Sequence, residues 1–172
     1  AFYEILEMES NYTGPATYYY SHINYEQGNY ETALKGFRDI DDDPLFSGIA
    51  PYYISQILFM QKKYEEVIAY APALMDSVSE KRLGEIAKIT GESYFMLDKY
   101  KEAIPFLETY RSNSSAYTIH DRYQLAYAYY NNQEYDNALP LFEGISYRNT
   151  EIAQSALYHL GDCYLKTGDK NK

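Results

Sequence analysis

The sequence contains no tryptophan, a single cysteine and only three histidines among 172 residues. One cysteine, Cys163, excludes an intramolecular disulfide. No histidine stands in a His-x-x-x-His arrangement and no Cys-x-x-Cys pair occurs, so no zinc site is predicted. Hydrophobic runs are also short, well below the roughly 18 to 20 apolar residues that a membrane-spanning helix needs. We therefore expect no metal, no cofactor and no direct insertion of this segment into a membrane.

Positive charge is scarce. Lys and Arg number 15 against 25 Asp and Glu, which gives a formal net charge of −10. Nucleic acid is a poor partner for such a surface, because its binding depends on Lys and Arg that neutralise phosphates. An anionic membrane surface is excluded as a partner for the same reason.

Catalytic motifs are missing as well. The sequence has no Gly-rich phosphate loop and no Gly-x-Ser-x-Gly elbow. His159 and Cys163 are four residues apart, a spacing that could pair a thiol with a base, but a packing cysteine beside a surface histidine is the simpler interpretation. Residues 41–43 are three aspartates without the ligand spacing of a calcium loop, and we interpret them as a solvated turn. The sequence therefore predicts no catalytic residue and no enzyme.

Tyrosine, in contrast, is abundant: 23 Tyr accompany 7 Phe. A tyrosine packs its ring in a core but keeps a hydroxyl that needs a partner or water. So many tyrosines indicate many half-buried aromatic positions, as thin helical layers have.

The sequence also repeats. Four similar short segments each contain a central tyrosine, and these tyrosines are 34, 36 and 35 residues apart. Each tyrosine is followed three residues later by Ala or Val and seven residues later by a hydrophobic residue. A small residue stands nine positions before each tyrosine, and a fifth small residue continues that series. The tyrosines are Tyr30, Tyr64, Tyr100 and Tyr135; the small residues are Ser21, Ser55, Gly91, Ala126 and Gly161.

This pattern resembles the tetratricopeptide repeat, in which a Leu-Gly pair, a Tyr and then Ala-x-x-x-Phe recur over about 34 residues. The resemblance implies an all-α fold, a right-handed superhelical solenoid of antiparallel helix pairs. The small residue of the first helix and the Ala of the second let the two helices approach closely. Phe37 and Phe142 should then fill the space between layers.

The repeat predicts where the helices lie. First helices are expected near residues 15–27, 50–61, 80–96, 117–131 and 151–167, and second helices near 30–40, 64–76, 100–112 and 135–146. The end of another second helix is expected at 1–9. We interpret residues 1–172 as one solenoid fragment of a longer chain, with units at about 14–46, 48–80, 84–116 and 119–150 and partial units at 1–13 and 151–172. Its cut ends could self-associate, and Leu157, Leu160 and Tyr164 should lack a covering helix.

In tetratricopeptide-repeat proteins the first helices line a concave groove that receives partner peptides. Steps of three or four residues along each first helix select the residues of one face. Most of them are aromatic here, and two interpretations stay open: a recognition surface, since Tyr supplies contact area at low entropic cost, or rings that pack between neighbouring helices. Only Lys88 fits the carboxylate clamps that hold chaperone C-termini, so that ligand is not expected. The predicted groove residues, called here the first-helix row, are Tyr18, His22, Tyr25, Tyr52, Gln56, Phe59, Lys88, Glu92, Phe95, Tyr123, Tyr127 and Tyr130; the partial last unit adds Tyr158 and Asp162.

The leading functional hypothesis is a protein–protein interaction scaffold that binds a peptide or a protein segment in this groove. A glycan-binding module is an alternative, because sugar faces stack on aromatic rings. A purely architectural arm of a longer protein is another. The Tyr-rich segments also resemble those of long bacterial cell-envelope repeat proteins, which would imply a periplasmic or envelope location. Nothing else in the sequence indicates a compartment.

Overall fold

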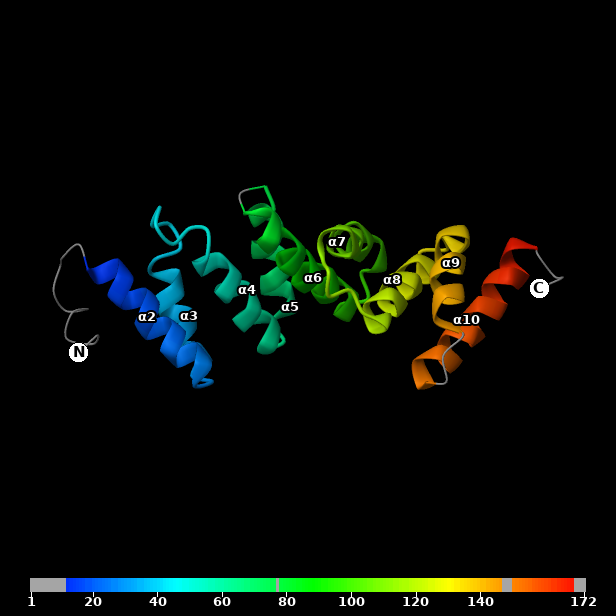
Figure 1. Cartoon of the computed structure of the whole chain (residues 1–172), viewed down its shortest axis with the longest axis horizontal. Coiled ribbons are helices and arrows are strands. Elements are labelled where there is room, and N and C mark those ends of the chain that lie inside the picture. The colour runs from blue at the N-terminus through cyan, green and yellow to red at the C-terminus, as the bar shows by residue number, and fades with distance from the viewer. Residues whose placement is uncertain (1–11, 77, 147–149, 169–172) are drawn as a thin grey trace. The chain divides into compact units, whose positions relative to one another are not determined.

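The structure is a computed structural model of the chain, and it describes residues 12–76, 78–146 and 150–168. All regular elements among these residues are helical, and they fall into two compact units, residues 1–82 and 83–172. The first unit contains α2 (Thr13–Glu26), α3 (Tyr30–Arg38), α4 (Ala50–Met60), α5 (Tyr64–Tyr70) and the short 3-10 helix η1 (Ala71–Leu74). The second contains most of α6 (Glu80–Met96), then α7 (Tyr100–Asn113), α8 (Ile119–Asn131), α9 (Tyr135–Ser146) and α10 (Glu151–Thr167) (Figure 1).

Helices that follow one another in sequence pack side by side within each unit, as α2 and α3 do in the first and α8, α9 and α10 do in the second. Each first helix predicted from the repeat is present, and its bounds agree with the prediction to within two residues. The all-α fold of paired helices is therefore confirmed. The helix expected at 1–9 lies outside the described residues.

The second helices show one departure. The helix expected at 64–76 ends at Tyr70 and continues only as the 3-10 turn η1. Pro72 stands at the start of that turn, where its missing N–H removes an α-helical hydrogen bond and its ring crowds the preceding turn. Pro105 and Pro140 lie inside the continuous helices α7 and α9, so the proline position, and not proline itself, decides where the helix ends.

The turn after each first helix has the same backbone geometry. One residue there has a positive φ, and five such residues occur along the described chain, 34 to 36 residues apart. After the first four, the next N–H donates to the carbonyl five residues earlier at 2.8–3.0 Å, the bond that closes a Schellman-type helix end. The five residues are Gly28 (φ 79°), Lys62 (59°), Asp98 (56°), Gln133 (62°) and Gly168 (83°).

Buried side chains of neighbouring helices form the core, and in the second unit one cluster joins residues of α7, α8, α9 and α10. Phe37 and Phe142 have no exposed surface, as the repeat predicts. A Cβ on Gly91 would lie 2.8 Å from Cδ2 of Leu107 on α7, so α6 and α7 approach to the distance that only glycine permits. At the equivalent position of α10, a Cβ on Gly161 would meet no atom within 4 Å. The two equivalent glycines therefore differ: the chain packs closely at Gly91 and leaves open space at Gly161.

No helix in the described part of the chain combines the length and the apolar character needed to cross a membrane.

Candidate functional site

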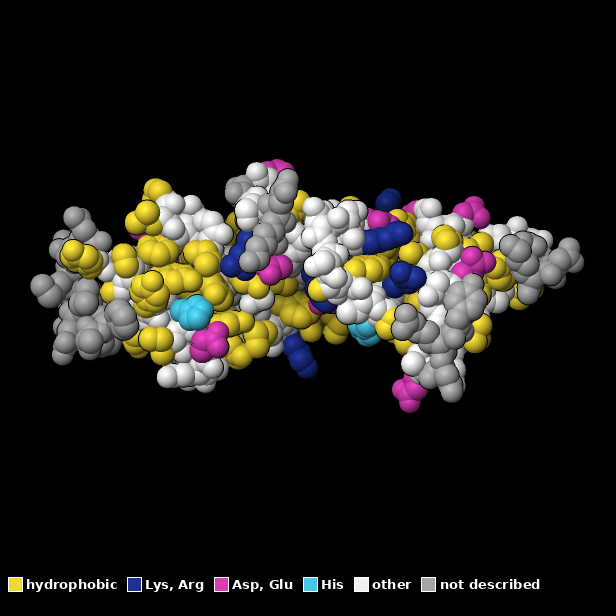
Figure 2. Space-filling view, in the orientation of Figure 1, with side chains coloured by type: hydrophobic (Ala, Val, Ile, Leu, Met, Phe, Trp, Pro, Cys, Tyr) yellow, Lys and Arg dark blue, Asp and Glu magenta, His cyan; other side chains and the backbone are white. Residues whose placement is uncertain are grey.

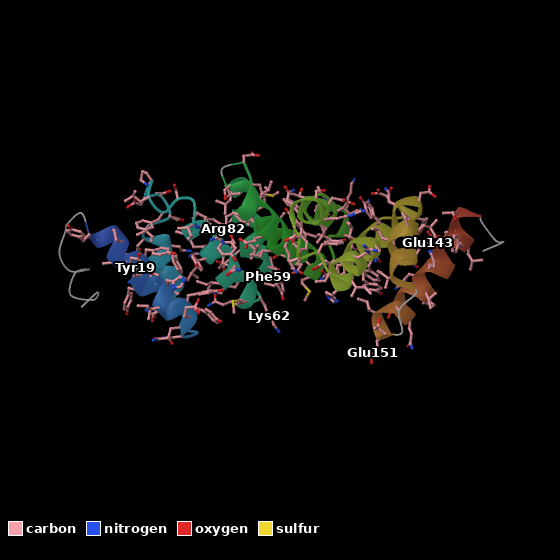
Figure 3. The ribbon with its side chains drawn as sticks, viewed as in Figure 1. Tyr19, Phe59, Lys62, Arg82, Glu143 and Glu151 are labelled. Carbon is pink, nitrogen blue, oxygen red and sulfur yellow. The ribbon has the colours of Figure 1, made fainter. Side chains whose placement is uncertain are left out.

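The first-helix row comes from α2, α4, α6 and α8, and all twelve of its side chains are half-buried. None is fully exposed and none is fully enclosed. Phe59, for example, lies near the C-terminal end of α4, one turn before Lys62 (Figure 3). Each residue thus gives part of its surface to packing and keeps part accessible, so the two interpretations of the row describe different portions of the same side chains.

In the first unit the row is built around a ring that the sequence did not single out. Tyr53 stacks on the buried Phe37 with a centroid distance of 4.8 Å and an interplanar angle of 6°. Three row residues of α2 then pack against Tyr53, with centroid distances of 6.4 Å for Tyr18, 5.3 Å for His22 and 5.2 Å for Tyr25. The residues of α2 are therefore held by α4 and, through Tyr53, by the core.

Hydrogen bonds link Tyr25, Gln56 and Tyr52 in this unit. The Tyr25 hydroxyl donates to Oε1 of Gln56 at 2.7 Å, and Nε2 of Gln56 donates to the Tyr52 hydroxyl at 2.6 Å. The guanidinium of Arg82 lies 4.1 Å above the Tyr52 ring, a cation–π distance. Burial is the main reason that the pKa of Tyr18 rises to about 12, so that phenol is neutral at physiological pH. Figure 2 shows hydrophobic side chains, with one histidine among them, over much of this face of α2 and α4.

The second unit has a similar cluster on α6 and α8. Tyr123 and Tyr127 stack at 5.9 Å with an angle of 22°, and Phe95 of α6 packs against Tyr127 at 5.9 Å. The Tyr130 hydroxyl donates to Oδ2 of Asp162 on α10 at 2.6 Å. Asp162 is in turn paired with Lys166 at 3.0 Å. Tyr130 and Asp162 thus repeat the contact that Tyr25 and Gln56 make in the first unit.

His159, interpreted from the sequence as a surface histidine, is half-buried and also packs in the aromatic cluster. Its ring lies 4.8 Å from Tyr130, 5.2 Å from Tyr127 and 5.5 Å from Phe142, and its Nδ1 is buried without a hydrogen-bond partner. Burial lowers the pKa of His159, although the nearby Asp162 opposes that shift. The ring is therefore a neutral member of the aromatic cluster. Helix periodicity could not show this, because the enclosing rings come from α8 and α9.

Cys163 is fully buried, as expected for a packing cysteine. Burial, with a smaller contribution from Asp162, raises the pKa of its thiol to about 11. The nucleophile in thiol chemistry is the thiolate, and this group is protonated at neutral pH. The arrangement therefore does not form an activated Cys–His pair.

Lys88 and Glu92, the charged members of the row, belong to an ion cluster. Nζ of Lys88 lies 2.9 Å from Oδ1 of Asp121 on α8 and 3.8 Å from Oε1 of Glu92. Asp121 also accepts from the backbone N–H and the hydroxyl of Thr118 at 2.7 and 2.6 Å, and its own N–H donates to Oγ1 of Thr118 at 3.2 Å, which completes a capping box at the start of α8. Asp121 was not among the residues predicted from the sequence, although Thr-x-x-Asp before a helix is a recognisable capping signal.

Other sites are less developed. A hollow of about 560 Å³ lies between α2 and α3, lined by residues that include Thr17, Lys35 and Asp39, and none of the first-helix row lines it. Within the described ranges, no group of three or more His, Cys, Asp or Glu residues is arranged to hold a metal ion.

Comparison with known proteins agrees with this architecture. Residues 123–171 match the family model described as tetratricopeptide repeat. No curated protein sequence matches the chain. Among solved structures, the fold is similar to that of YrrB, described as a TPR protein with an unusual peptide-binding site, with a TM-score of 0.77 and 18% identity over 99% of this chain and 86% of that one.

Two further similar structures carry the name MamA. MamA AMB-1 aligns with a TM-score of 0.71 and 16% identity over 92% of this chain and 85% of that one. MamA from Desulfovibrio magneticus RS-1 aligns with a TM-score of 0.64 and 14% identity over 92% and 97%. At these identities the likeness concerns the fold. Residues 123–171 therefore match the tetratricopeptide repeat family model, and the described helices have the all-α, tetratricopeptide-repeat-like fold of paired helices.

Proposed function

We propose that the chain is a protein-interaction scaffold whose first-helix row binds a peptide or an extended segment of another protein. The observation that carries the proposal is the half-burial of all twelve row residues. Rings that are already fixed by packing and hydrogen bonds lose little conformational entropy when a partner covers their accessible parts. The Tyr25–Gln56–Tyr52 chain of hydrogen bonds provides such preorganisation in the first unit.

The packing of the rings favours a protein segment over a sugar. Sugars stack on free ring faces, but stacking within the unit already occupies ring faces of Tyr53, Tyr18 and Tyr123. The side chains and backbone amides of a peptide combine apolar contact with hydrogen bonding, which suits tyrosines that carry both a ring and a hydroxyl.

The proposal is tested by panning a library of random twelve-residue peptides on the whole chain and measuring the affinity of the enriched peptides by fluorescence polarisation. Tyr52→Ala and Tyr123→Ala remove one row residue from each unit. Each substitution should lower the affinity for the peptides that bind its unit by roughly 5- to 30-fold, the effect of an interface residue that contributes about 1–2 kcal/mol.

Two control variants match these changes. Tyr19→Ala alters α2 beside the row, at a side chain that is 55% exposed (Figure 3). Tyr129→Ala alters α8, the helix of Tyr123, at a half-buried tyrosine whose hydroxyl donates to Glu108 on α7. Both controls should change affinity less than twofold. Unchanged affinity in Tyr52→Ala and Tyr123→Ala would refute a role for the row; binding of cell-wall oligosaccharides but no peptide would favour the glycan module, and no ligand of either kind would favour the architectural arm.

A further inference from the structure

The ion cluster on α6 and α8 carries an excess of negative charge at a half-buried place. Side-chain exposure is 3% for Asp121, 16% for Glu92 and 34% for Lys88, so one lysine faces two carboxylates that are largely removed from water. Lys88 makes its close contact with Asp121, at 2.9 Å against 3.8 Å for Glu92. Asp121 is further stabilised by hydrogen bonds from Thr118. Glu92 has the longer of the two contacts that Lys88 makes with these carboxylates.

The repeat shows what Glu92 lacks. Its equivalents in α4 and α10 are Gln56 and Asp162, and each accepts a tyrosine hydroxyl from an earlier first helix, at 2.7 and 2.6 Å. Glu92 has instead the 3.8 Å contact with Nζ of Lys88. Burial accordingly raises the pKa of Glu92, although Lys88 opposes the shift, as expected for a carboxylate whose charge is incompletely compensated.

Apolar rings adjoin this carboxylate. Phe95 is one helical turn after Glu92 on α6, a separation that brings side chains together. Lys88 on one side of Glu92 reaches Asp121 of α8, and Phe95 on the other side packs against Tyr127 of α8 at 5.9 Å. Glu92 therefore faces α8 between these two contacts, with aromatic surface beside it.

We propose that Glu92, together with Phe95 and Tyr127, receives a lysine or arginine side chain of the bound partner segment. The alkyl part of that side chain packs on the two rings, and its charged end pairs with the carboxylate. Such a residue supplies the positive charge that the cluster lacks, and the net charge of −10 attracts a basic segment over longer distances. The inference rests on the proposed function, since it names the chemistry of the ligand at the second unit's part of the first-helix row.

The test uses the peptides enriched on the whole chain, which should contain Lys or Arg more often than the starting library. Each basic residue of a chosen peptide is replaced in turn by norleucine or citrulline, and both forms are measured on the wild type and on Glu92→Gln. Loss of the ion pair should weaken the basic peptide at least about fivefold on Glu92→Gln, allowing for partial exposure of the site. The neutral form should bind both proteins equally, so the two changes are coupled.

A matched control separates this contact from general attraction. Glu102→Gln removes the same charge from an exposed position on α7 and should leave the difference between basic and neutral peptides intact. Thermal melts of both variants check folding, and Gln keeps the shape of Glu92. The carboxyl pKa of Glu92, followed by carbon NMR, should also fall when the basic peptide binds, because a nearby cation stabilises the ionised form.

The outcomes distinguish the inference from the function on which it rests. Enriched peptides without basic residues, or equal weakening of basic and neutral peptides by Glu92→Gln, would overturn the inference while Tyr123→Ala still reported a working site. Peptides that bind the wild type but ignore both Tyr123→Ala and Glu92→Gln would remove the site itself.

Discussion

Alanine at Gly91 should destabilise the chain, whereas alanine at the equivalent Gly161 should not. In a helix interior, Ala is favoured over Gly by about 0.8–1.0 kcal/mol, and this gain applies at both positions. At Gly161 a Cβ meets no atom within 4 Å, so the variant should be as stable as the wild type or up to about 1 kcal/mol more stable.

At Gly91 the added Cβ would lie 2.8 Å from Cδ2, 3.0 Å from Cγ and 3.1 Å from the backbone nitrogen of Leu107. Carbon atoms prefer roughly 3.5–4.0 Å, and Leu107 is only 2% exposed, so its side chain has little room to turn away. The nearby backbone nitrogen means that α7 itself must shift. Overpacking of this kind costs about 1–3 kcal/mol, which exceeds the helix-propensity gain and leaves a net loss of about 1 kcal/mol.

The assay is urea denaturation followed by circular dichroism at the helix band. Because stacked repeats do not always unfold in one step, amide hydrogen exchange should accompany it and assign the loss of protection to α6 and α7 in Gly91→Ala. A Gly91→Ala variant at least as stable as the wild type would refute the close packing of these helices. Equal destabilisation by Gly161→Ala would refute the contrast between the two glycines.

Two further changes concern the second unit. Phe142→Ala removes a ring with no exposed surface and should lower the free energy of unfolding by about 3–5 kcal/mol, measured by urea denaturation; a loss below about 1 kcal/mol would contradict the packing. Burial lowers the folded-state pKa of His159 below the unfolded value of about 6.5, so the unfolded chain binds the proton more readily and the wild type loses thermal stability between pH 7 and pH 5. His159→Phe should make this loss of thermal stability smaller. The contribution of His159 is present above that unfolded value and is lost as the pH falls towards the folded one, so an identical pH profile in the variant would show that His159 does not titrate in this way.

The sequence was sufficient for the helices because the repeat imposes the same spacing on each pair. It failed at α5, where Pro72 competes with helical periodicity and the outcome depends on which turn the proline occupies. Pro105 and Pro140 are accepted as the sixth residue of α7 and α9, whereas Pro72 would be the ninth residue of α5 and coincides with its end.

The candidate site was harder to predict from the repeat spacing than the helices were. Stepping along one helix finds residues that share a face, and it found the twelve row residues, but it carries no information about the neighbouring helix. Tyr53 and His159 join the clusters through rings on other elements, and Asp121 through a lysine 33 residues earlier. These contacts arise from the stacking of helix pairs and have no local period.

The five turns with positive φ indicate how the sequences of neighbouring repeats can diverge. A side chain in that conformation costs about 1–2 kcal/mol, yet the described turns use lysine, aspartate and glutamine as well as glycine. The flanking helices, and not the residue type, therefore hold the backbone in place. Substitutions can accumulate at this position while each hairpin keeps its geometry, so neighbouring repeats become unlike in sequence and stay interchangeable in shape.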